Sequence, residues 1–387
     1  MPDGLFDLPE ELVLFRDEIR RFVDRELIPV ERHVQADGQL PAELKTALSA
    51  KAKAAGLWLL DVPEALGGQG LGLLALALFW EETGRTTAVP SRDYSMFGPS
   101  VGPILLGLNE QQKQRYLHPV LQGQKIACFA QTEPDSGSDP ASMRTRAVRE
   151  QGCYRLNGVK RFITNADKAD FIQVMAVTDP HKGARGGISC LLVDMDTPGV
   201  RIASRQQTMM GEQPCEIVFE NVEVPAENLV GAEGEGFKLA QTWINHGRIR
   251  HGAKSCGLAS RCIELAASYA LQRKTFGAPL ADRQGIQWMI ADSYLETHAA
   301  RLMVYQAAAK LDRGEDARSE TYMVKIFGDE MGFRAADRCM QIFGGMGLTT
   351  ELPVERFWRD QRSFIITEGP SEVLRNALAA QIFRQFR

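Results

Sequence analysis

The sequence predicts an α+β protein in which a helical N-terminal region, a β region and a helical C-terminal region follow one another. Apolar residues recur at three- and four-residue spacings through about the first 120 residues. From Lys125 to about residue 230, short runs rich in β-branched and aromatic residues alternate with Gly, Asn, Asp and Pro. The helical pattern returns near Gly234 and continues to the end. A chain of 387 residues exceeds what one hydrophobic core usually organises.

We therefore expect three domains: an N-terminal α-helical domain over 1–122, a middle β domain over 123–232 and a C-terminal α-helical domain over 233–387 that resembles a four-helix bundle. In the first domain, Leu8, Leu12, Phe15 and Ile19 mark one apolar helix face. Further helices are expected over 41–55 and 71–83. Clusters of Pro and Gly separate them.

The middle domain is expected to be an antiparallel sheet, arranged as a small barrel or sandwich. No segment of helix length separates its strands, and a parallel connection would need one. Asn157-Gly158 predicts a β-hairpin turn, because both residues tolerate positive φ.

Composition excludes several classes of protein. The 45 Lys and Arg residues against 49 Asp and Glu give a net charge of -4, so bulk charge does not indicate a nucleic-acid surface. The seven cysteines include no C-x-x-C pair, which argues against a metal site or a disulfide framework and favours free thiols in a reducing compartment. The N-terminus lacks the features of a signal peptide, and the longest apolar stretch, Leu71–Trp80, is too short to span a membrane. A soluble, cytoplasmic protein is expected.

Two polar segments follow strands in the β region. Gln131–Asp139 is crowded with Gly, Ser and Asp, so it offers N–H groups and hydroxyls to a ligand, although a solvated turn has the same composition. Arg161–Asn165 contains Phe162 and Thr164, which could stack on a ring system and hydrogen-bond its edge. A cross-strand packing pair explains these two residues equally well.

Three further segments lie in the C-terminal region. Arg273–Gly277, followed by Gln284, suits a phosphate contact, or else a helix end whose basic residues complement its dipole. Gln341–Gly347 has three glycines that would let its backbone approach a ligand, but it follows no strand and is not a Rossmann fingerprint. Glu368 is expected to begin the last helix, where a lone carboxylate usually serves only the helix dipole.

Together these segments resemble the acyl-CoA dehydrogenase family over nearly the whole chain. TEPDSGSD resembles the family's TEP-x-x-GSD signature, RFITN its W-I-T-N element and RKTFG its R-x-x-F-G element. QIFGGMG resembles its Q-x-x-G-G-x-G loop, and ITEGPSEVLR its Y-E-G-T-x-x-x-x-R segment. Five matches in the family's order make a chance origin very improbable.

The resemblance implies non-covalent FAD, an acyl-CoA substrate, an electron-transferring flavoprotein as electron acceptor, and a homotetramer or homodimer. The cofactor contacts that it implies are Phe129, Gln131, Thr132, Gly137, Ser138, Phe162, Thr164, Gln284, Gly344, Pro370 and Glu372, with Arg273, Phe276, Gln341 and Gly345 reaching the FAD of the neighbouring subunit. The implied substrate contacts are Ser138, Arg248, Thr367 and Gly369. For Arg248, a salt bridge on the helix surface is the alternative.

The reaction implied by the resemblance is α,β-dehydrogenation of the thioester to a trans-2-enoyl-CoA. Glu368 would remove the α-proton while the β-hydride passes to flavin N5. Burial beside an apolar acyl chain strengthens a carboxylate as a base. Some family members carry the base at the position matching Gly247, and a glycine cannot act as one, so the assignment stays with Glu368.

Departures from the family pattern concern the substrate more than the reaction. Phe162 replaces the usual Trp, Thr367 a Tyr and Pro370 a Thr. Pro370 is compatible with the first turn of a helix. Arg92 could pair with a distal carboxylate of the acyl group, or simply with its neighbour Asp93 at the surface.

Arg250 and His251 are more polar than the average residue of their helix, without an assigned role. Two other functions remain open on the same fold. One is a flavin oxidase or monooxygenase, and the other a non-catalytic acyl-CoA-binding flavoprotein. The retained Glu368 favours the dehydrogenase over both.

Overall fold

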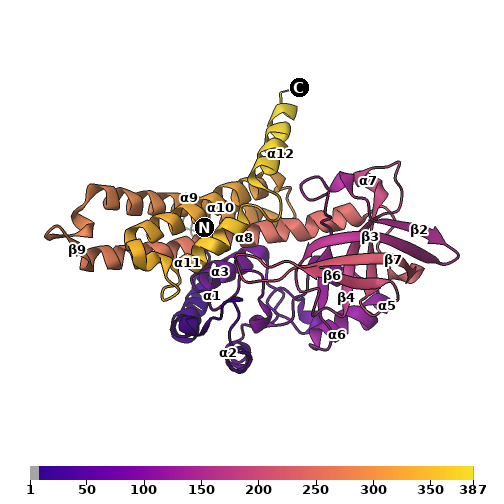
Figure 1. Ribbon diagram of the computed structural model, residues 1–387, viewed down its shortest axis with the longest axis horizontal. Helices are drawn as coiled ribbons and strands as arrows, with labels where there is room; N and C mark the ends of the chain where they lie inside the picture. The colour runs from indigo at the N-terminus through magenta and orange to yellow at the C-terminus, as the bar shows by residue number, and fades with distance from the viewer. Residues whose placement is uncertain (1–7, 387) are drawn as a thin grey trace. The chain divides into compact units, whose positions relative to one another are not determined.

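The computed structural model describes residues 8–386 and divides into two compact units (Figure 1). The helical unit comprises residues 8–97 and 245–386, and the sheet unit comprises residues 98–244. The predicted order of helices, strands and helices is confirmed. Between residues 8 and 386, no helix is both long and apolar enough to cross a membrane.

The N-terminal part of the helical unit contains α1 (Glu10–Phe22), α2 (Ala42–Ala54) and α3 (Leu73–Gly84). Helix α1 begins with Glu10 and Glu11 and ends with Arg20 and Arg21, an order that complements the helix dipole. A π-helical turn (Val23–Leu27) and a 3₁₀ turn (Ile28–His33) extend it. Helix α3 is buried along almost its whole length, so it forms the centre of this part of the unit.

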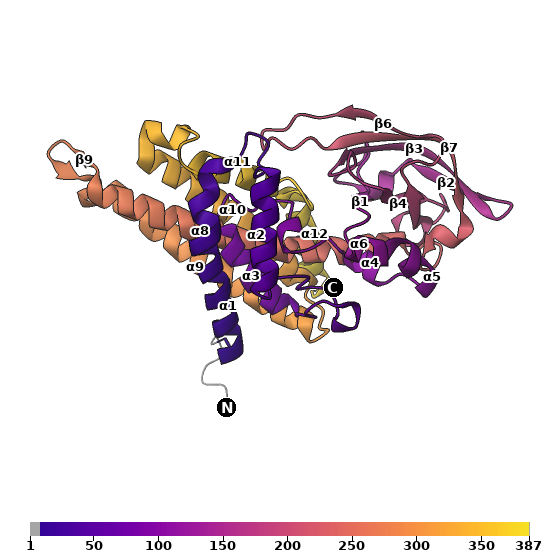
Figure 2. The same ribbon diagram turned by 90° about the horizontal axis from the view of Figure 1, so that it is seen from below.

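The C-terminal part is a set of long helices. They are α8 (Gly236–Gln272), α9 (Gln284–Asp312), α10 (Arg318–Phe343), α11 (Val354–Phe364) and α12 (Ser371–Arg384). Helices α8, α9 and α10 run side by side, and a small hairpin of β9 (Lys274–Thr275) and β10 (Ala278–Pro279) joins α8 to α9 (Figures 1 and 2).

Charged contacts fasten α3 to α9 inside the helical unit. The Asp312 carboxylate, at the end of α9, accepts from the N–H groups of Leu73 and Leu74 at 2.6 and 2.9 Å and so caps the start of α3. Further along, Arg301 of α9 donates to the buried Glu81 of α3 at 2.7 Å. These contacts hold α3, and the loop that follows it, against the C-terminal helices.

The sheet unit is built on one hydrogen-bonded sheet with the strand order β6-β7-β3-β2-β4-β5-β8, and β1 pairs with β4. The strands are β1 (Ala127–Ala130), β2 (Arg146–Glu150), β3 (Cys153–Ile163), β4 (Phe171–Val177), β5 (Ile188–Asp194), β6 (Val200–Arg205), β7 (Cys215–Pro225) and β8 (Leu229–Val230). Short helices α4 (Pro103–Leu106), α5 (Glu110–Gln112) and α6 (His118–Leu121) belong to the same unit.

The sheet is mainly antiparallel, as expected, but two details differ from the prediction. Strand β4 pairs in parallel with β1 and, at one position, with β2, so the sheet is not wholly antiparallel and its path is open rather than a closed barrel. Asn157-Gly158 lies within β3 at a register shift, not in a turn. Gly158 is required there because an added Cβ would lie 2.6 Å from the Thr145 Cα. The β2–β3 turn falls instead at Gln151 and Gly152, both with positive φ.

Candidate active site

Glu368 lies in the turn between α11 and α12 in a left-handed backbone conformation, with φ of 55°. Gly369 follows with φ of 98°, and Pro370 is the N-cap residue of α12. The expectation that Glu368 begins the last helix is therefore wrong, and Pro370 precedes the first helical turn. A glutamate in this conformation costs on the order of 1 kcal/mol. Contacts around the turn must hold it in place.

Two buried cations supply those contacts. The Arg248 Nε donates to the carbonyl oxygen of Glu368 at 3.1 Å, and the Lys325 Nζ donates to the carbonyl oxygen of Ile365 at 2.8 Å. Both cationic side chains are buried, and burial lowers the pKa of each. A salt bridge on the helix surface is thereby excluded for Arg248. Its observed hydrogen-bond partners are the backbone of the proposed base and the side chain of Asn245.

The Glu368 carboxylate lies over the bare backbone of Gly247. An added Cβ at Gly247 would be 1.6 Å from Oε2 of Glu368, so only glycine leaves room for the carboxylate. The Oε1 atom is 3.1 Å from Nη2 of Arg250 and 3.7 Å from Nε2 of His251. The Oε2 atom is buried and has no hydrogen-bond partner among the described residues. One carboxylate oxygen is thus left with the capacity to accept a proton.

A buried polar network lies next to the Glu368 carboxylate, on the side of His251. The His251 ring stacks on Phe364 with centroids 4.1 Å apart, and its Nδ1 is 3.5 Å from Oδ2 of Asp329. The Ser255 hydroxyl donates to Asp329 at 3.1 Å and accepts from Gln361 at 2.7 Å. Ser255, Asp329 and Gln361 are buried and joined by hydrogen bonds, while the stacking on Phe364 orients the imidazole beside Glu368.

The loop after α3 reaches the same region. Arg92 donates to the Ser363 hydroxyl at 3.4 Å, close to the turn that carries Glu368. Asp93 pairs with Lys45 at 2.7 Å. Burial alone would raise the pKa of Asp93, but Lys45 and the hydrogen bonds from Ser95 together outweigh burial, so the pKa lies below its usual value. The carboxylate of Asp93 is therefore committed to Lys45, and Arg92 is directed to α11.

In the sheet unit, the structure brings the predicted residues Gln131, Thr132 and Phe162 together. The Arg161 N–H donates to the carbonyl of Thr132 at 2.8 Å, and the Lys160 ammonium donates to the carbonyl of Gln131 at 2.9 Å. Burial lowers the pKa of Lys160 to about 8, although its ion pair with Glu133 at 2.9 Å opposes that shift. The side-chain oxygen of Gln131 is buried without a hydrogen-bond partner among the described residues. It therefore has an unused acceptor.

Phe162 presents a flat apolar surface to its surroundings. It has φ of 58°, its side chain is 55% exposed, and it lies where the β3–β7 register shifts. Such an irregularity turns a side chain out of the regular alternation of a strand. Nearby, Phe129 stacks on Trp243 with centroids 5.4 Å apart. Of the other predicted contacts, Gly137 and Ser138 are exposed and Thr164 is half-buried.

The remaining predicted residues gather at one end of the long helices, away from Glu368. Arg273, Phe276 and Gln284 belong to the β9–β10 hairpin and its flanks, while Gln341, Gly344 and Gly345 end α10. The stacking of Tyr269 on Phe343, with centroids 4.4 Å apart, joins the two segments. Along α8, the 25 residues from Gly247 to Gln272 span about 38 Å at about 1.5 Å per residue.

Phe276 is the most conspicuous side chain at this end of the helices. It is 100% exposed and has φ of 48°. A fully exposed phenylalanine in a left-handed conformation is not explained by packing within its own chain. Added Cβ atoms at Gly344 and Gly345 would meet nothing within 4 Å, so the backbone there is open to a ligand.

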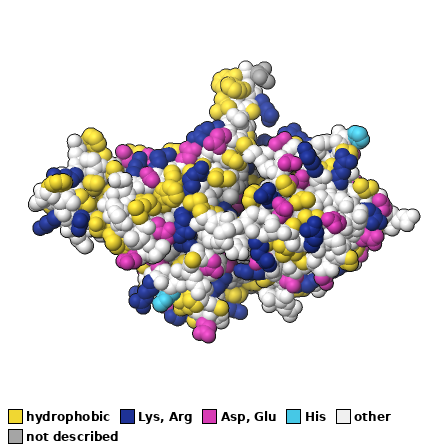
Figure 3. Space-filling model, viewed as in Figure 1, with side chains coloured by type: hydrophobic (Ala, Val, Ile, Leu, Met, Phe, Trp, Pro, Cys, Tyr) yellow, Lys and Arg dark blue, Asp and Glu magenta, His cyan; other side chains and the backbone are white. Residues whose placement is uncertain are grey.

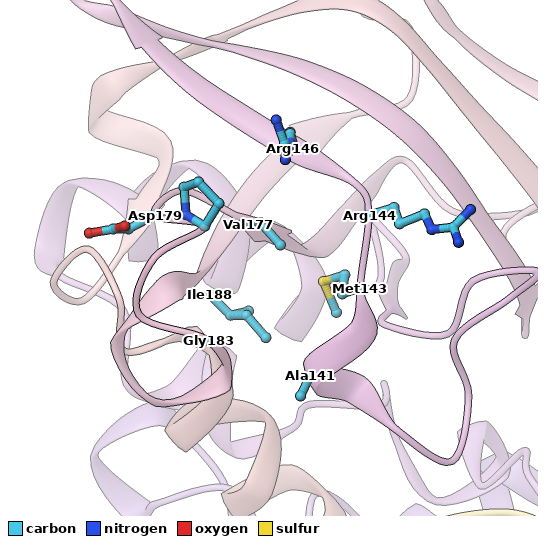
Figure 4. A pocket seen from close by; sticks show the side chains of 9 residues that line it. Ala141, Met143, Arg144, Arg146, Val177, Asp179, Gly183 and Ile188 are labelled. Carbon is cyan, nitrogen blue, oxygen red and sulfur yellow. The ribbon is translucent and has the colours of Figure 1, made fainter.

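A separate open cavity of about 470 Å³ lies in the sheet unit, after the Gly137–Ser138 loop. Met143, Val177 and Ile188 converge on it, while the guanidinium groups of Arg144 and Arg146 point away (Figure 4). None of the predicted site residues lines it. Asp179 is the one carboxylate among its described lining residues, which include no second acid and no histidine.

Known proteins resemble this chain over nearly its whole length. Sequence models of the acyl-CoA dehydrogenase N-terminal, middle and C-terminal domains match residues 9–124, 128–222 and 234–383. The mitochondrial short-chain specific acyl-CoA dehydrogenase of Mus musculus is 36% identical over 387 residues, covering 98% of this chain and 92% of the relative. The chain belongs to the acyl-CoA dehydrogenase family.

Solved structures of other acyl-CoA dehydrogenases have the same fold. Butyryl-CoA dehydrogenase from Megasphaera elsdenii superposes with a TM-score of 0.85 at 31% identity, covering 98% of this chain and 100% of that one. A glutaryl-coenzyme A dehydrogenase in complex with glutaryl-CoA gives 0.86 at 30% identity, covering 98% and 97%. The protein is therefore an oxidoreductase, and its fold class, with helical N-terminal and C-terminal domains and a middle β domain, is confirmed.

Acyl-CoA dehydrogenases are flavoproteins, so FAD is the expected cofactor. The residues present fit a flavin. The orphaned Gln131 oxygen can accept from a ring N–H, and the exposed Phe162 offers a stacking face. A second exposed aromatic, Phe276, and the open backbone at glycines 344 and 345 leave room for a ligand at the other end of the long helices.

Several members of the Glu368 site were missed or given no role from the sequence. In the sequence, only their polarity distinguishes Arg250 and His251, yet both face the carboxylate. They lie three and four residues after Gly247, on one side of α8. Lys325 and Asp329 lie four residues apart in α10, and most of the residues near them in that helix are buried. Charged residues at such interior positions were the available signal.

Proposed function

We propose that this acyl-CoA dehydrogenase converts an acyl-CoA thioester into a trans-2-enoyl-CoA, with FAD as hydride acceptor and Glu368 as the base. One observation carries the proposal. Glu368 is held in a strained turn by Arg248 and Lys325, with the buried Oε2 atom of its carboxylate lacking a hydrogen-bond partner among the described residues. Strain that the surroundings maintain at one carboxylate is typical of a catalytic position.

Glu368 can act through its side chain and its backbone. The carboxylate takes the α-proton as the Cα–H bond breaks, and becomes a neutral carboxylic acid. Negative charge then develops on the thioester oxygen. The N–H groups of Ile366 and Thr367 both donate to the carbonyl of Ser363, whereas no acceptor among the described residues takes the Glu368 N–H, which we propose to donate to that oxygen. A bound flavin supplies the acceptor for the hydride that leaves the β-carbon.

The test is anaerobic titration of the purified holoenzyme with straight-chain and ω-carboxyl acyl-CoA thioesters while the visible absorption of the oxidised flavin is followed. At least one thioester is expected to bleach the flavin. A thioether analogue such as S-butyl-CoA, which has no acidic α-proton, should bind without bleaching. Absence of bleaching by every thioester would contradict the proposal, and peroxide formation during turnover in air would indicate the oxidase alternative.

We further propose that residues of a second subunit, in a homodimer or homotetramer, complete each FAD-binding site. The cofactor residues near Phe276 are separated from Gly247, which contacts Glu368, by about 38 Å along α8, so they are too far to serve the same flavin as the Glu368 of their own chain. Exposed apolar side chains on the helical unit support an association surface: Leu271, Trp288, Tyr294, Leu295, Leu348 and Phe383. In Figure 3, yellow side chains gather on the free end of α12.

Replacing Phe276 with alanine is therefore expected to weaken FAD binding by roughly tenfold, because an aromatic contact contributes about 1 kcal/mol beyond its buried area. The flavin-to-protein ratio after gel filtration measures this loss, and the elution volume reports the oligomer. Leu14→Ala, which removes a large exposed apolar side chain from α1, outside the proposed association surface, is the matched control. If Phe276→Ala retains as much FAD as the control does, the proposed contact from the neighbouring subunit is wrong.

For the electron acceptor, we propose an electron-transferring flavoprotein on the basis of the family resemblance.

The cysteines support a reducing compartment for this protein, because all seven are free and six of them are buried.

A further inference from the structure

The proposed base carries its own counter-ion. Arg250 reaches Oε1 of Glu368 at 3.1 Å, with side chains that are 28% and 18% exposed, so the pair is only partly screened by water. A positive neighbour stabilises the carboxylate and opposes its protonation. When Glu368 takes a proton from a neutral acyl group, the guanidinium loses its partner. The pair as it stands therefore hinders the reaction of a neutral acyl chain.

The surroundings of Arg250 offer donors that lack acceptors. The Nε of Arg250 is buried without a hydrogen-bond partner among the described residues, and so is the hydroxyl of Tyr94. The Tyr94 ring lies 5.9 Å from the Arg250 guanidinium and 5.0 Å from the ammonium of Lys254. A buried donor without an acceptor is unfavourable, so this arrangement fits a ligand that brings acceptor oxygens.

The other charged side chains near Arg250 and Tyr94 do not supply the missing acceptor oxygens. Arg92 comes from the same loop as Tyr94 and adds a third cation. Asp93 in that loop is held by Lys45, outside the cluster. Asp61 acts on Arg250 and Asp360 acts on Tyr94 through their charge, but neither carboxylate is a hydrogen-bond partner of the Arg250 Nε or of the Tyr94 hydroxyl.

We propose that the preferred acyl group carries a carboxylate at its far end, and that this carboxylate draws Arg250 away from Glu368. This inference rests on the proposed function, since it names the substrate class of the same site. The substrate carboxylate accepts from Arg250 and Tyr94, with Arg92 as a further cation. The Glu368 carboxylate thereby loses its ion pair with Arg250 and is able to take the α-proton. When the α-proton moves to Glu368, the guanidinium remains paired with the substrate, so no cation is left uncompensated.

The experiment compares matched thioesters on the holoenzyme: succinyl-CoA with butyryl-CoA, glutaryl-CoA with pentanoyl-CoA, and adipyl-CoA with hexanoyl-CoA. In at least one pair, kcat/KM is expected to be ten times higher or more for the carboxylated member. Arg250→Gln should abolish this preference by lowering kcat/KM for the carboxylated thioester and raising it for the neutral one. Arg250→Lys, which keeps the charge but loses the planar fork, should retain part of the preference.

A binding measurement separates recognition from turnover. The thioether S-(4-carboxybutyl)-CoA cannot be oxidised, and Arg250→Gln should weaken its binding at least tenfold, while binding of S-pentyl-CoA changes little. Arg334→Gln, on α10 and paired with Glu296, is the control and should change neither ligand. Flavin content and melting temperature show whether each variant is folded.

Two outcomes overturn this inference. One is a wild-type enzyme that uses the neutral member of every pair as well as, or better than, the carboxylated one, which decides the question even if the Arg250 variants do not fold. The other is a folded Arg250→Gln enzyme that keeps the preference. Both leave the proposed dehydrogenase intact, whereas failure of all thioesters to bleach the flavin would remove the proposed function itself.

Discussion

Replacing Glu368 with glutamine is expected to lower kcat by about 100- to 10,000-fold, the usual contribution of a general base. Glutamine has nearly the same shape and can still contact Arg250, but its amide cannot take the α-proton. The turn should keep its conformation, because Arg248 and Lys325 bind main-chain carbonyls that this change leaves untouched. Stopped-flow reduction of the flavin by the best acyl-CoA measures the effect.

Two controls make the Glu368→Gln result specific. The variant should retain its FAD, as judged by the flavin-to-protein ratio. Glu355→Gln removes a carboxylate that is paired with Arg359 within α11, and it should reduce the flavin at the wild-type rate. Normal flavin reduction by Glu368→Gln would show that another group removes the proton.

Replacing Gly247 with alanine is expected to lower kcat by about a hundredfold without loss of stability. The new Cβ would lie 1.6 Å from Oε2 of Glu368, so the carboxylate has to move. A displacement of about 1 Å at a reacting group can cost about a hundredfold in rate. The displaced atom is the end of a flexible side chain, and alanine favours a helix over glycine by about 0.5–1 kcal/mol. The free energy of unfolding should therefore stay equal or rise slightly.

The measurements are the rate of flavin reduction and the midpoint of denaturant unfolding on the same preparations. Gly107→Ala is the control, since its added Cβ would meet the Pro103 carbonyl oxygen only at 3.4 Å. A Gly247→Ala enzyme with wild-type kcat would mean that the Glu368 carboxylate does not work from the position seen here.

The order of helical and β regions could be predicted from the sequence, and a base could be proposed, because both rest on local patterns. Apolar periodicity marks helices such as α1, and β-branched runs mark β4 and β5. Glu368 could be assigned because the segments around it resemble those of a known family, and because Gly247 cannot act as a base. Its closeness to Gly247 in space, however, required the structure.

The errors come from contacts between residues distant in sequence. Asn157-Gly158 has the composition of a hairpin turn, yet the close approach of Thr145 places it inside a strand. The parallel pairing of β1 with β4 joins segments more than 40 residues apart, so no local signal announces it. The role of Arg250 could not be predicted for the same reason, because it depends on a glutamate 118 positions away.

The meeting of Gly247 and Glu368 also limits how this family can evolve. Two elements far apart in the chain reach one point in space, and that point holds only one long side chain. A lineage that moves the base from one element to the other must change both positions. If the old base goes first, the intermediate has none, and if the new one arrives first, the intermediate is overcrowded. Each position therefore tends to keep its residue as long as the other does, even though no bond joins the two side chains.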